Sequence, residues 1–482
     1  DPAKGRISIG GKDLTTLPEA ITGRRMACVN QNPYIVNVTI ENNLFYGLRH
    51  RPIREIEYTG DAGKTRQLEL READASGNSK FDPATDWTDY EAAGVGNEAE
   101  LRVAGLRALQ LVGFYDDVYL LGLRGQIDPD GQPDLAKAIL RARVNLADKL
   151  GQPGIAQLVE RWDRSKYNSN ATVAENLMFG NPVGDSFDFE RLAEHPYVLS
   201  VLDKVGLTQV FLRTGYEVAS TTVELFADLP PDHEFFQQFS FISSDDLPLM
   251  QELLARANKD KLDELKNEDR AKLMSLPFKL IPARHRLGHI DEGFTGKVLE
   301  ARAVFARDLP GELAHQVDFF DPEQYTANAN LQDNILFGKV VYGQAKAAEQ
   351  VGDLVGEVVD GLGLRDTVAQ VGLGFECGIA GGRLTSTQRQ KLAIARCVVK
   401  RPDLLILSDA TAPLDNASQA RVLDGLLGEF KGRGLIWSLQ RPSLANKFDH
   451  VLVMAGGKLI EHGTFNDLDQ DGKQFKQLLA HD

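Results

Sequence analysis

A Gly-Lys-Thr sequence at residues 63–65 is the first candidate for phosphate chemistry in this chain of 482 residues. A phosphate-binding loop needs glycines whose backbone N–H groups surround the phosphates at a helix start, and a lysine that reaches them. The residues before it are Tyr58-Thr59-Gly60-Asp61-Ala62, so a tyrosine stands where the first glycine is required. We therefore predict a solvated loop at 58–65, and we find no phosphate cradle elsewhere in the sequence.

The histidines and acidic residues give little support for a metal site. His285 and His289 are four residues apart, but Pro282 and Gly288 interrupt the helix that would place both on one face, and no third ligand is evident. Residues 128–131 (Asp-Pro-Asp-Gly) are too short for a calcium loop and are typical of a turn. The cysteines are too few and too scattered for a disulfide framework, which favours a reducing compartment: Cys28, Cys377 and Cys397.

Polar side chains stand at the ends of predicted helices and strands near the C-terminus. Residues 388–399 have strong helical character and follow three hydroxyl residues at 385–387. The apolar run 404–407 is short enough for a buried strand and leads into Ser408 and Asp409. Further strands are predicted at 26–29, 435–439 and 451–454. Strands that alternate with helices predict an α/β fold with a largely parallel sheet covered by helices.

The segment 384–415, LTSTQRQKLAIARCVVKRPDLLILSDATAPLD, resembles part of the ATP-binding cassette (ABC) transporter ATPases without a gap. That part runs from the signature motif through the Walker B strand to the D-loop. The agreeing positions are Gln388, Arg389, Gln390, Ala393, Ile394, Ala395, Arg396, Pro402, Ala410, Thr411, Leu414 and Asp415. Four other stretches resemble the region after the P-loop helix, the Q-loop, the H-loop and the closing strand pair, respectively: 1–14, 29–47, 438–443 and 451–468.

The resemblance, which is to the exporter type, implies that residues 385–388 face the γ-phosphate held by a partner cassette. Thr385 keeps the hydroxyl of the signature serine, but Ser386 and Thr387 replace its two glycines. Side chains at those positions obstruct close approach of the backbone to phosphate. Their hydroxyls could donate to phosphate instead, so weak nucleotide binding by Thr385, Ser386, Thr387 and Gln388 stays open.

The catalytic positions implied by the resemblance are also altered. Ser408 stands where an aspartate positions Mg²⁺, and Asp409 where a longer glutamate polarises the attacking water. A register slip that made Asp409 the metal residue would turn it away from the nucleotide, because successive strand residues face opposite sides. Gln440 replaces the H-loop histidine and cannot carry a proton. Gln31, which would contact Mg²⁺ from the Q-loop, and Asp415 of the D-loop are retained, so we predict a degenerate ATP and Mg²⁺ site.

The middle of the chain has no counterpart in an ordinary cassette. An apolar stripe at helical spacing predicts helix for residues 135–150, and similar stripes are present at 249–254 and 262–273. The polar stretch 53–90 is predicted to be a linker or mobile loop. We predict a P-loop ATPase core interrupted by a mainly helical insertion, with the following segments: core 1–52, insertion 53–320, helical subdomain 321–383 and core 384–482.

Three short segments resemble one another: TIENNLFYG at 39–47, TVAENLMFG at 172–180 and NLQDNILFG at 330–338. Their acid–Asn pairs begin at Glu41, Glu175 and Asp333, at offsets of 134 (175 − 41) and 158 (333 − 175) residues. Unequal offsets exclude a solenoid of fixed period. Partial duplication or insertion within one domain is the better interpretation, and chance similarity is the alternative.

Composition and charge restrict the partners. With 54 basic and 69 acidic residues the net charge is −15, which disfavours nucleic acid as a partner. No apolar run approaches the roughly 18 residues of a spanning helix. Because the chain starts at Asp1, we expect the P-loop and membrane helices upstream in a longer protein.

The resemblance implies an ABC transporter cassette at the cytoplasmic face of the cell membrane, with a second cassette and a transmembrane domain as partners. The alternative is a non-hydrolytic adaptor or regulatory protein that retains the cassette fold. A third possibility is a soluble cassette protein of translation or repair, which the exporter-like Q-loop and the acidic charge disfavour.

Overall fold

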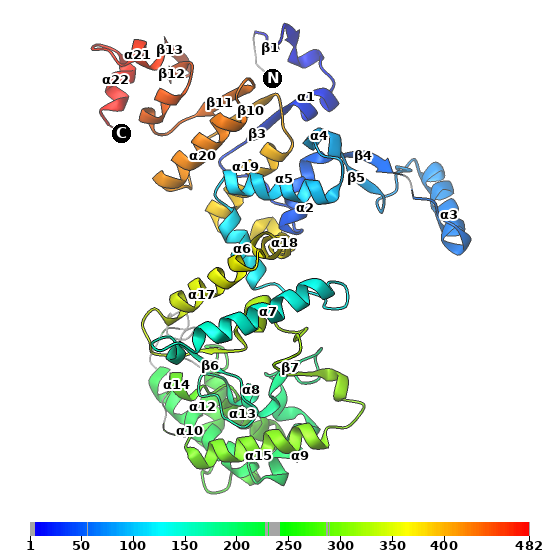
Figure 1. Cartoon of the computed structure of the whole chain (residues 1–482), viewed down its shortest axis with the longest axis vertical. Helices are drawn as coiled ribbons and strands as arrows, with labels where there is room; N and C mark the ends of the chain where they lie inside the picture. Colours follow the sequence, from blue (N-terminus) through cyan, green and yellow to red (C-terminus); the bar gives the residue numbers. More distant parts are fainter. Residues whose placement is uncertain are drawn as a thin grey trace. The chain divides into compact units, whose positions relative to one another are not determined.

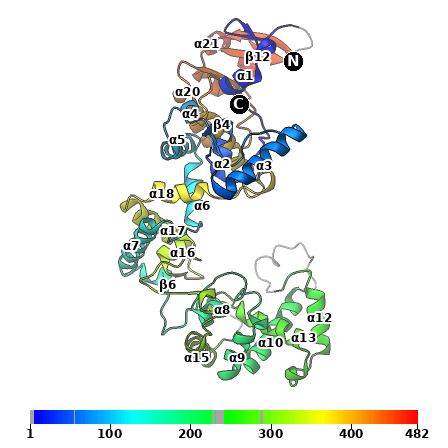
Figure 2. The same cartoon turned by 90° about the vertical axis from the view of Figure 1, so that its right-hand side faces the viewer.

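The chain forms two compact units in a computed structural model that describes residues 5–54, 56–226, 230, 242–285, 288 and 290–481. Unit 1 combines Asp1–Leu123 with Asp366–Asp482, and unit 2 is Arg124–Arg365 (Figures 1 and 2). Unit 2 is thus inserted between two halves of unit 1. These bounds differ from the segments predicted above, because residues 53–123 pack with the two ends of the chain and 321–365 pack with the middle.

A parallel sheet forms the centre of unit 1. Its strands, in order across the sheet, are β11 (Gly434–Ser438), β10 (Leu404–Ser408) and β3 (Met26–Val29). The register pairs Leu407 with Val29 and Ser408 with Ser438, so the three strands end at one edge. This confirms the predicted mixed fold with a parallel sheet. Leu405 and Leu407 of the central strand, which point to the same face of the sheet, are buried, whereas Leu404 and Ile406 on the other face are partly buried.

Helix α19 (Ser386–Val399) packs on this sheet against α2 (Ile40–Phe45) and α5 (Glu98–Leu111). Its Leu392 and Ile394 side chains are completely buried. Fully burying a leucine or isoleucine side chain contributes about 1.5–3 kcal/mol to folding. The sheet and these helices therefore hold the two halves of unit 1 together, although 242 residues (124 to 365) separate them in sequence.

The C-terminal strands do not join the parallel sheet. Within the described ranges, β12 (Val451–Ala455) pairs only with β13 (Lys458–Gly463), in an antiparallel hairpin. Helices α21 (Phe465–Leu468) and α22 (Gln474–Leu479) pack beside it. The strand predicted at 451–454 is therefore present but has an antiparallel partner.

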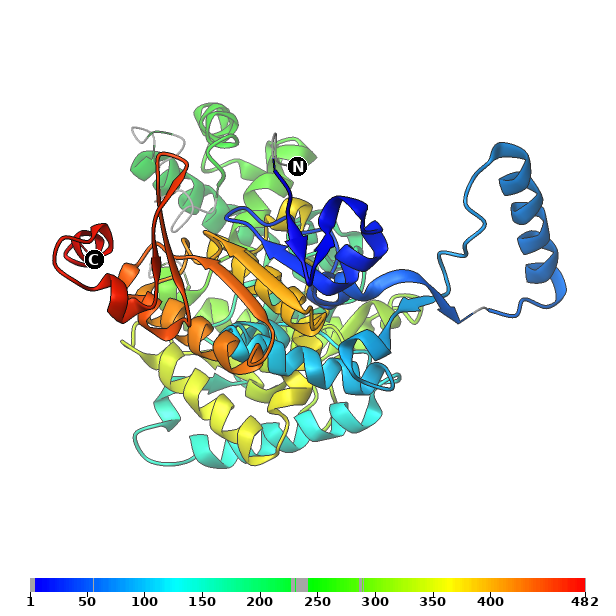
Figure 3. The ribbon, with the colours of Figure 1, turned by 90° about the horizontal axis from the view of Figure 1, so that it is seen from above.

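The predicted linker at 53–90 is wrong, because this stretch is structured. Strands β4 (Arg49–Arg54) and β5 (Asp86–Thr88) pair, and α3 (Gly60–Ser76) extends from them (Figure 3). The Gly-Lys-Thr sequence lies within α3, where Asp61 in the first turn accepts from Lys64 Nζ at 2.8 Å and Gly77 ends the helix. The prediction of a loop at 58–65 is corrected to a helix start, and its solvation is confirmed because α3 buries no residue.

Unit 2 is mainly helical. The stripe predicted at 135–150 forms α7 (Pro133–Leu150), and that at 249–254 lies in α12 (Leu247–Arg256). The stripe at 262–273 is not one helix, because a 3-10 turn precedes α13 (Asn267–Phe278). The largest completely buried side chains of unit 2 are phenylalanines: Phe187, Phe211, Phe278 and Phe305.

The three similar segments form the same short helix: α2, α8 (Val173–Met178) and α16 (Leu331–Leu336). Each has a buried asparagine in its middle: Asn43, Asn176 and Asn334. The structural offsets are 133 (176 − 43) and 158 (334 − 176), so the first offset of 134 is corrected by one residue. The acid–Asn pair that begins at Glu41 was therefore misaligned, because Asn42, and not Glu41, corresponds to the acidic residue of the other two segments. Shared structure at all three sites favours duplication over chance.

An arginine from a distant helix contacts each of these asparagines. Arg396 Nη2, Arg302 Nη2 and Arg143 Nη2 donate to the side-chain oxygens of Asn43, Asn176 and Asn334, at 2.9, 3.0 and 3.1 Å. In each case Nε donates to the backbone oxygen of the same asparagine at 2.7 Å. We call each short helix, its buried asparagine and this arginine a capped-helix module, numbered first to third in the order of the asparagines.

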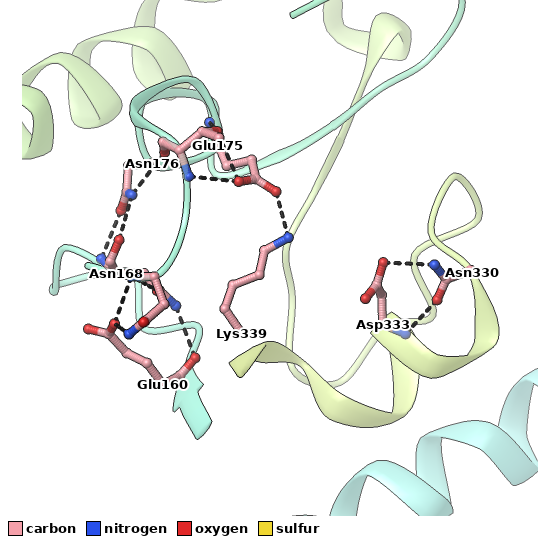
Figure 4. A network of polar contacts seen from close by, with 9 residues as sticks. Glu160, Asn168, Glu175, Asn176, Asn330, Asp333 and Lys339 are labelled. Carbon is pink, nitrogen blue, oxygen red and sulfur yellow. Dashed lines mark hydrogen bonds and ion pairs between the residues drawn. The ribbon is translucent and has the colours of Figure 1, made fainter. Parts of the chain in front are cut away.

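Two pairs of short strands join the second and third modules in unit 2. β6 (Val159–Arg161) pairs with β9 (Gly338–Val340), and β7 (Gly180–Pro182) pairs with β8 (Val317–Phe319), both antiparallel. Figure 4 shows the polar contacts there, with Lys339 reaching across to Glu175 at 2.7 Å. The two modules therefore close against each other.

Candidate functional site

The predicted catalytic residues lie at one edge of the unit 1 sheet. Ser408 ends β10, Asp409 follows it, and Gln31 and Gln440 come two residues after β3 and β11. Because the three strands are parallel and in register, their carboxyl ends bring these loops together. This is the edge at which ligands of open α/β sheets usually bind.

Asp409 supplies a carboxylate at this edge of the sheet, and its backbone conformation is unusual. Its φ is +50°, in the left-handed region that non-glycine residues seldom adopt. Its Oδ1 accepts from the hydroxyl of Ser438, on the neighbouring strand, at 3.3 Å. Strained positions of this kind persist where the surrounding structure holds them, and they cluster at functional sites. Ser438 was not predicted as a site residue from the sequence.

Side chains at the start of α19 hydrogen-bond to the backbone of its first turn. Thr385 is the N-cap, and its Oγ1 accepts from the backbone N–H of Gln388 at 3.2 Å while Gln388 Oε1 accepts from Thr385 N–H at 3.0 Å. Gln388 Nε2 donates to Asp117 at 2.9 Å, and the Thr387 hydroxyl donates to Pro413 O at 2.9 Å. The Thr387 hydroxyl and the Gln388 amide thus already donate within the chain, the latter to a carboxylate, whereas the Thr385 hydroxyl accepts and keeps its own proton.

Asp415 has a structural role as well as its predicted one. It is the N-cap of α20 (Asn416–Glu429), and it accepts from Ser418 Oγ at 2.7 Å and from Ser418 N–H at 2.9 Å. These hydrogen bonds lower the pKa of its carboxyl below the ordinary value. The charged form is therefore favoured, and Asp415 fixes where the helix begins.

Two further residues position the site and were missed by sequence reasoning. Gln390 Nε2 donates to Asn30 O at 2.9 Å, which ties α19 to the loop that carries Gln31. Arg396 Nη1 donates to Tyr34 O at 3.1 Å in the same loop. Both belong to the agreeing stretch, but their partners lie 360 and 362 residues away, and no local pattern could have identified them.

The residues at the sheet edge are a poor fit for Mg²⁺ by themselves. Mg²⁺ prefers carboxylate oxygens and water, whereas Ser408 and Gln31 offer a hydroxyl and an amide, and only Asp409 is acidic. No group of three potential metal-binding His, Cys, Asp or Glu residues is found in the described part of the chain. His285 Nδ1 accepts from the backbone N–H of Ile281 at 2.9 Å, and His289 lies outside the described residues.

No helix in the described ranges is long and apolar enough to cross a lipid bilayer.

Comparison with known proteins identifies relatives of part of the chain. It is 36% identical over 162 residues to an ATP-dependent lipid A-core flippase of Xylella fastidiosa, covering 33% of this chain and 26% of the relative. A protein of the same name from Xanthomonas euvesicatoria is 33% identical over 204 residues, covering 42% of this chain and 32% of the relative. The chain thus spans about a quarter to a third of the length of these relatives.

No family model matches the chain. A solved structure of a bacterial Atm1-family ABC exporter with ATP bound shares 29% identity over 26% of this chain and 22% of its own, with a TM-score of 0.23.

Proposed function

We propose that this chain is the nucleotide-binding portion of an ABC exporter, as its similarity to the ATP-dependent lipid A-core flippases over part of its length supports. In this proposal, unit 1 is a P-loop ATPase core that lacks its phosphate loop, and unit 2 is an insertion into it. The transporter would carry the missing loop and its membrane helices outside these 482 residues. The chain would lie at the cytoplasmic face of the cell membrane, with a second cassette as partner.

One observation carries the proposal: the stretch 384–415 is folded so that its polar residues meet those of the N-terminal loop. Ser408 ends β10, which lies beside β3, Asp409 follows it, and Gln31 follows β3. A chance resemblance in sequence would not place these residues at one edge of a parallel sheet. The agreement between motif and position therefore supports a nucleotide site that is completed by groups outside the chain.

We propose further that the site is degenerate. The hydroxyls of Thr385 and Thr387 already take part in hydrogen bonds within the chain, and Asp117 adds a negative charge beside them. A carboxylate next to a phosphate site repels the ligand. Gln440 offers no proton and Ser408 no charge, so Asp409 would be the one group that could polarise water. The chain would bind nucleotide weakly and transmit its binding, while the partner cassette hydrolyses it.

The adaptor function remains the second candidate, and a specific observation favours it. At the helix start that would receive phosphate, Thr385 and Gln388 hydrogen-bond to each other in a capping box, as expected of a protein that binds no ligand there. An adaptor would keep its structure and its partners without nucleotide. The two proposals differ in whether the full-length gene product binds ATP.

Restoring the altered positions tests the proposal in the full-length gene product. We expect Ser408→Asp, Asp409→Glu and Gln440→His together to raise steady-state ATP hydrolysis by about 10-fold or more, in line with the contributions of general acid–base groups. The control carries Asp409→Gln in place of Asp409→Glu, beside the same two other substitutions, and should show no gain. If the restored protein neither hydrolyses nor binds ATP, the cassette proposal fails and the adaptor is favoured.

A further inference from the structure

A cavity of about 600 Å³ lies in unit 2 between α13 and α9 (Pro196–Lys204), both labelled in Figure 2. Helix α13 lines it with one face, because four of its lining residues recur at helical spacing: Asn267, Arg270, Ala271 and Met274. The opposite wall includes the apolar side chains of Ala193 and Leu199. A volume of several hundred Å³ is typical of sites that bind small organic molecules.

One buried donor on this face of α13 has no acceptor. Arg270 Nε is buried and makes no hydrogen bond in the part of the chain that the structure describes. Its neighbours on the same face, Ala271 and Met274, also line the cavity, so the guanidinium lies next to an apolar wall. Native proteins seldom leave a buried donor unsatisfied, because the group has given up its hydrogen bond to water. We therefore expect the missing acceptor to come from a group that enters the cavity.

The start of α13 offers further donors near Arg270. Asn267 and Glu268 begin the helix and line the cavity, and no side chain among the described residues caps this end. The first N–H groups of a helix have no partner within the helix and carry a partial positive charge. Helical side chains lean toward the N-terminus, so Arg270 leans toward this turn. The uncapped turn and the guanidinium can thus donate to one acceptor group.

The rim of the cavity restricts the charge of that group. The exposed side chains of Glu194, Glu268 and Lys272 line it. Two rim carboxylates against one rim ammonium disfavour a ligand with a double negative charge, such as phosphate. A single carboxylate carries two oxygens, which can accept from a guanidinium and from backbone N–H groups at once. The apolar walls favour an apolar body attached to it.

We infer that this cavity binds a small organic monocarboxylate with an apolar body. The carboxylate accepts from Arg270 Nε and from the first turn of α13, and the body contacts Leu199, Ala271 and Met274. All of these residues belong to unit 2, whereas the proposed nucleotide site is formed by residues of unit 1. The inference therefore does not rest on the proposed function, and it makes unit 2 a ligand-binding unit in its own right.

A panel of acids with matched amides tests this inference in the full-length gene product. Butanoate, hexanoate and hydrocinnamate are each compared by isothermal titration calorimetry with their primary amides, which have a similar shape and no charge. We expect at least one acid to bind at least ~10-fold more tightly than its amide, since hydrogen bonds to a charged group are the stronger ones. If no acid binds more tightly than its amide, the inference is overturned. Inorganic phosphate that binds as tightly as the best acid would overturn it too.

Two substitutions locate the acid in the cavity. Arg270→Met keeps an apolar stem of similar length and removes the donor. We expect it to weaken the best acid by at least ~10-fold and to leave its amide unaffected. The urea midpoint of the unliganded variant should stay unchanged or rise, because the removed donor has no partner without a ligand. Ala271→Phe fills the apolar part of the cavity and should weaken the acid and the amide alike.

The matched control is Arg307→Met, since the Arg307 side chain is 70% exposed and does not line the cavity. It should bind the acid like the unchanged protein, and an equal loss at both arginines would overturn the inference by assigning the effect to net charge. A lower urea midpoint in unliganded Arg270→Met would overturn it by showing that the guanidinium already has a partner. An acid affinity unaffected by Ala271→Phe would place the ligand outside the cavity, with the same consequence.

Discussion

The first capped-helix module, in unit 1, and the second and third, in unit 2, hold the same helix in different ways. In unit 2, Arg302 Nη1 donates to three backbone oxygens, those of Asp163, Arg164 and Lys166, and Arg143 Nη1 does the same with Asp321, Pro322 and Gln324. In unit 1, Arg396 Nη1 donates to one backbone oxygen among the described residues, that of Tyr34. The loop before the helix is therefore wrapped around the arginine in unit 2 and is open in unit 1.

The aromatic residues of these loops show the same difference. Tyr34 is 75% exposed in unit 1, whereas the hydroxyls of Tyr167 and Tyr325, 133 (167 − 34) and 291 (325 − 34) residues further on, are buried. Burial raises the pKa of Tyr325 to about 12. The open loop of unit 1 is the one that carries Gln31. Duplication thus kept the local fold in all three places, and only unit 1 left its loop accessible for a ligand or partner.

The comparison predicts its largest effect at the arginines of unit 2. Arg302→Ala removes five hydrogen bonds, four of which are to backbone oxygens, so we expect it to destabilise unit 2 by about 4 kcal/mol or more. Arg302→Lys should not restore stability, since an ammonium cannot reach the same fork of acceptors. Urea unfolding followed by Trp162 fluorescence, with Trp87 and Trp437 replaced by Phe, reports on unit 2 alone.

The control for this prediction is Arg307→Ala on the same helix, α15 (Glu292–Asp308), where the side chain is 70% exposed. It should leave the urea midpoint of unit 2 almost unchanged, because ion pairs at the surface contribute little to stability. Equal losses at Arg302 and Arg307 would show that the module does not depend on its arginine.

A smaller effect is expected in unit 1. Arg396→Ala removes three hydrogen bonds, so we expect a loss of about 2 kcal/mol. Unfolding followed by Trp87 fluorescence, with Trp162 and Trp437 replaced by Phe, measures it. A loss as large as that at Arg302 would contradict the distinction between open and wrapped loops.

Acid should weaken unit 2 through His285. Burial, with the nearby charge of Arg284, lowers the pKa of His285 to about 4 from an ordinary 6.5. Because the unfolded chain binds the proton more tightly, stability is full above pH 6.5 and is lost as pH falls toward 4. Urea unfolding at several pH values should show this slope, and His285→Asn, which can still accept from Ile281 N–H, should flatten it. An unchanged slope in the variant would assign the acid sensitivity to other groups.

The smallest effects are expected at two matched helix caps. Thr172 in unit 2 and Thr385 in unit 1 both form capping boxes, and replacing either by Ala should cost about 1 kcal/mol of stability. If the Thr385 hydroxyl serves only as a cap, Thr385→Ala leaves the ATP affinity of the full-length protein unchanged, and Thr172→Ala is the control for general loosening. A fall in affinity at Thr385 alone would show that its hydroxyl also meets phosphate.

Local sequence signals predicted the parts of the fold that depend on neighbours in sequence. The apolar runs 404–407 and 26–29 became strands of a parallel sheet, and the stripe from Leu135 to Leu150 became one helix. The sequence analysis did not predict helix α3, because its residues are mostly polar and no buried apolar stripe marks it. The assignment of catalytic and nucleotide-binding roles remains a prediction, since the structure shows where those residues lie and not what they bind.

The contacts that organise the molecule could not be read from the sequence. Arg143 and Asn334 are 191 residues apart, and Arg396 and Asn43 are 353 apart. An arginine in an otherwise apolar helix face is a weak signal, because Lys and Arg often lie at the surface with only their stems buried. The three segments of similar sequence indicated a duplication, but neither the short helices that they form nor the distant partner that each helix requires.

The insertion of unit 2 between the halves of unit 1 has a consequence for synthesis on the ribosome. β3 needs β10 as its neighbour, so the N-terminal half of unit 1 must wait while 242 residues (124 to 365) are added. At about 5–20 residues per second this takes roughly 10–50 s. Unit 2 is complete and can fold in that interval, whereas the open edge of β3 is exposed to wrong partners until the last part of the chain emerges. Chaperone demand should therefore fall on the first half of unit 1.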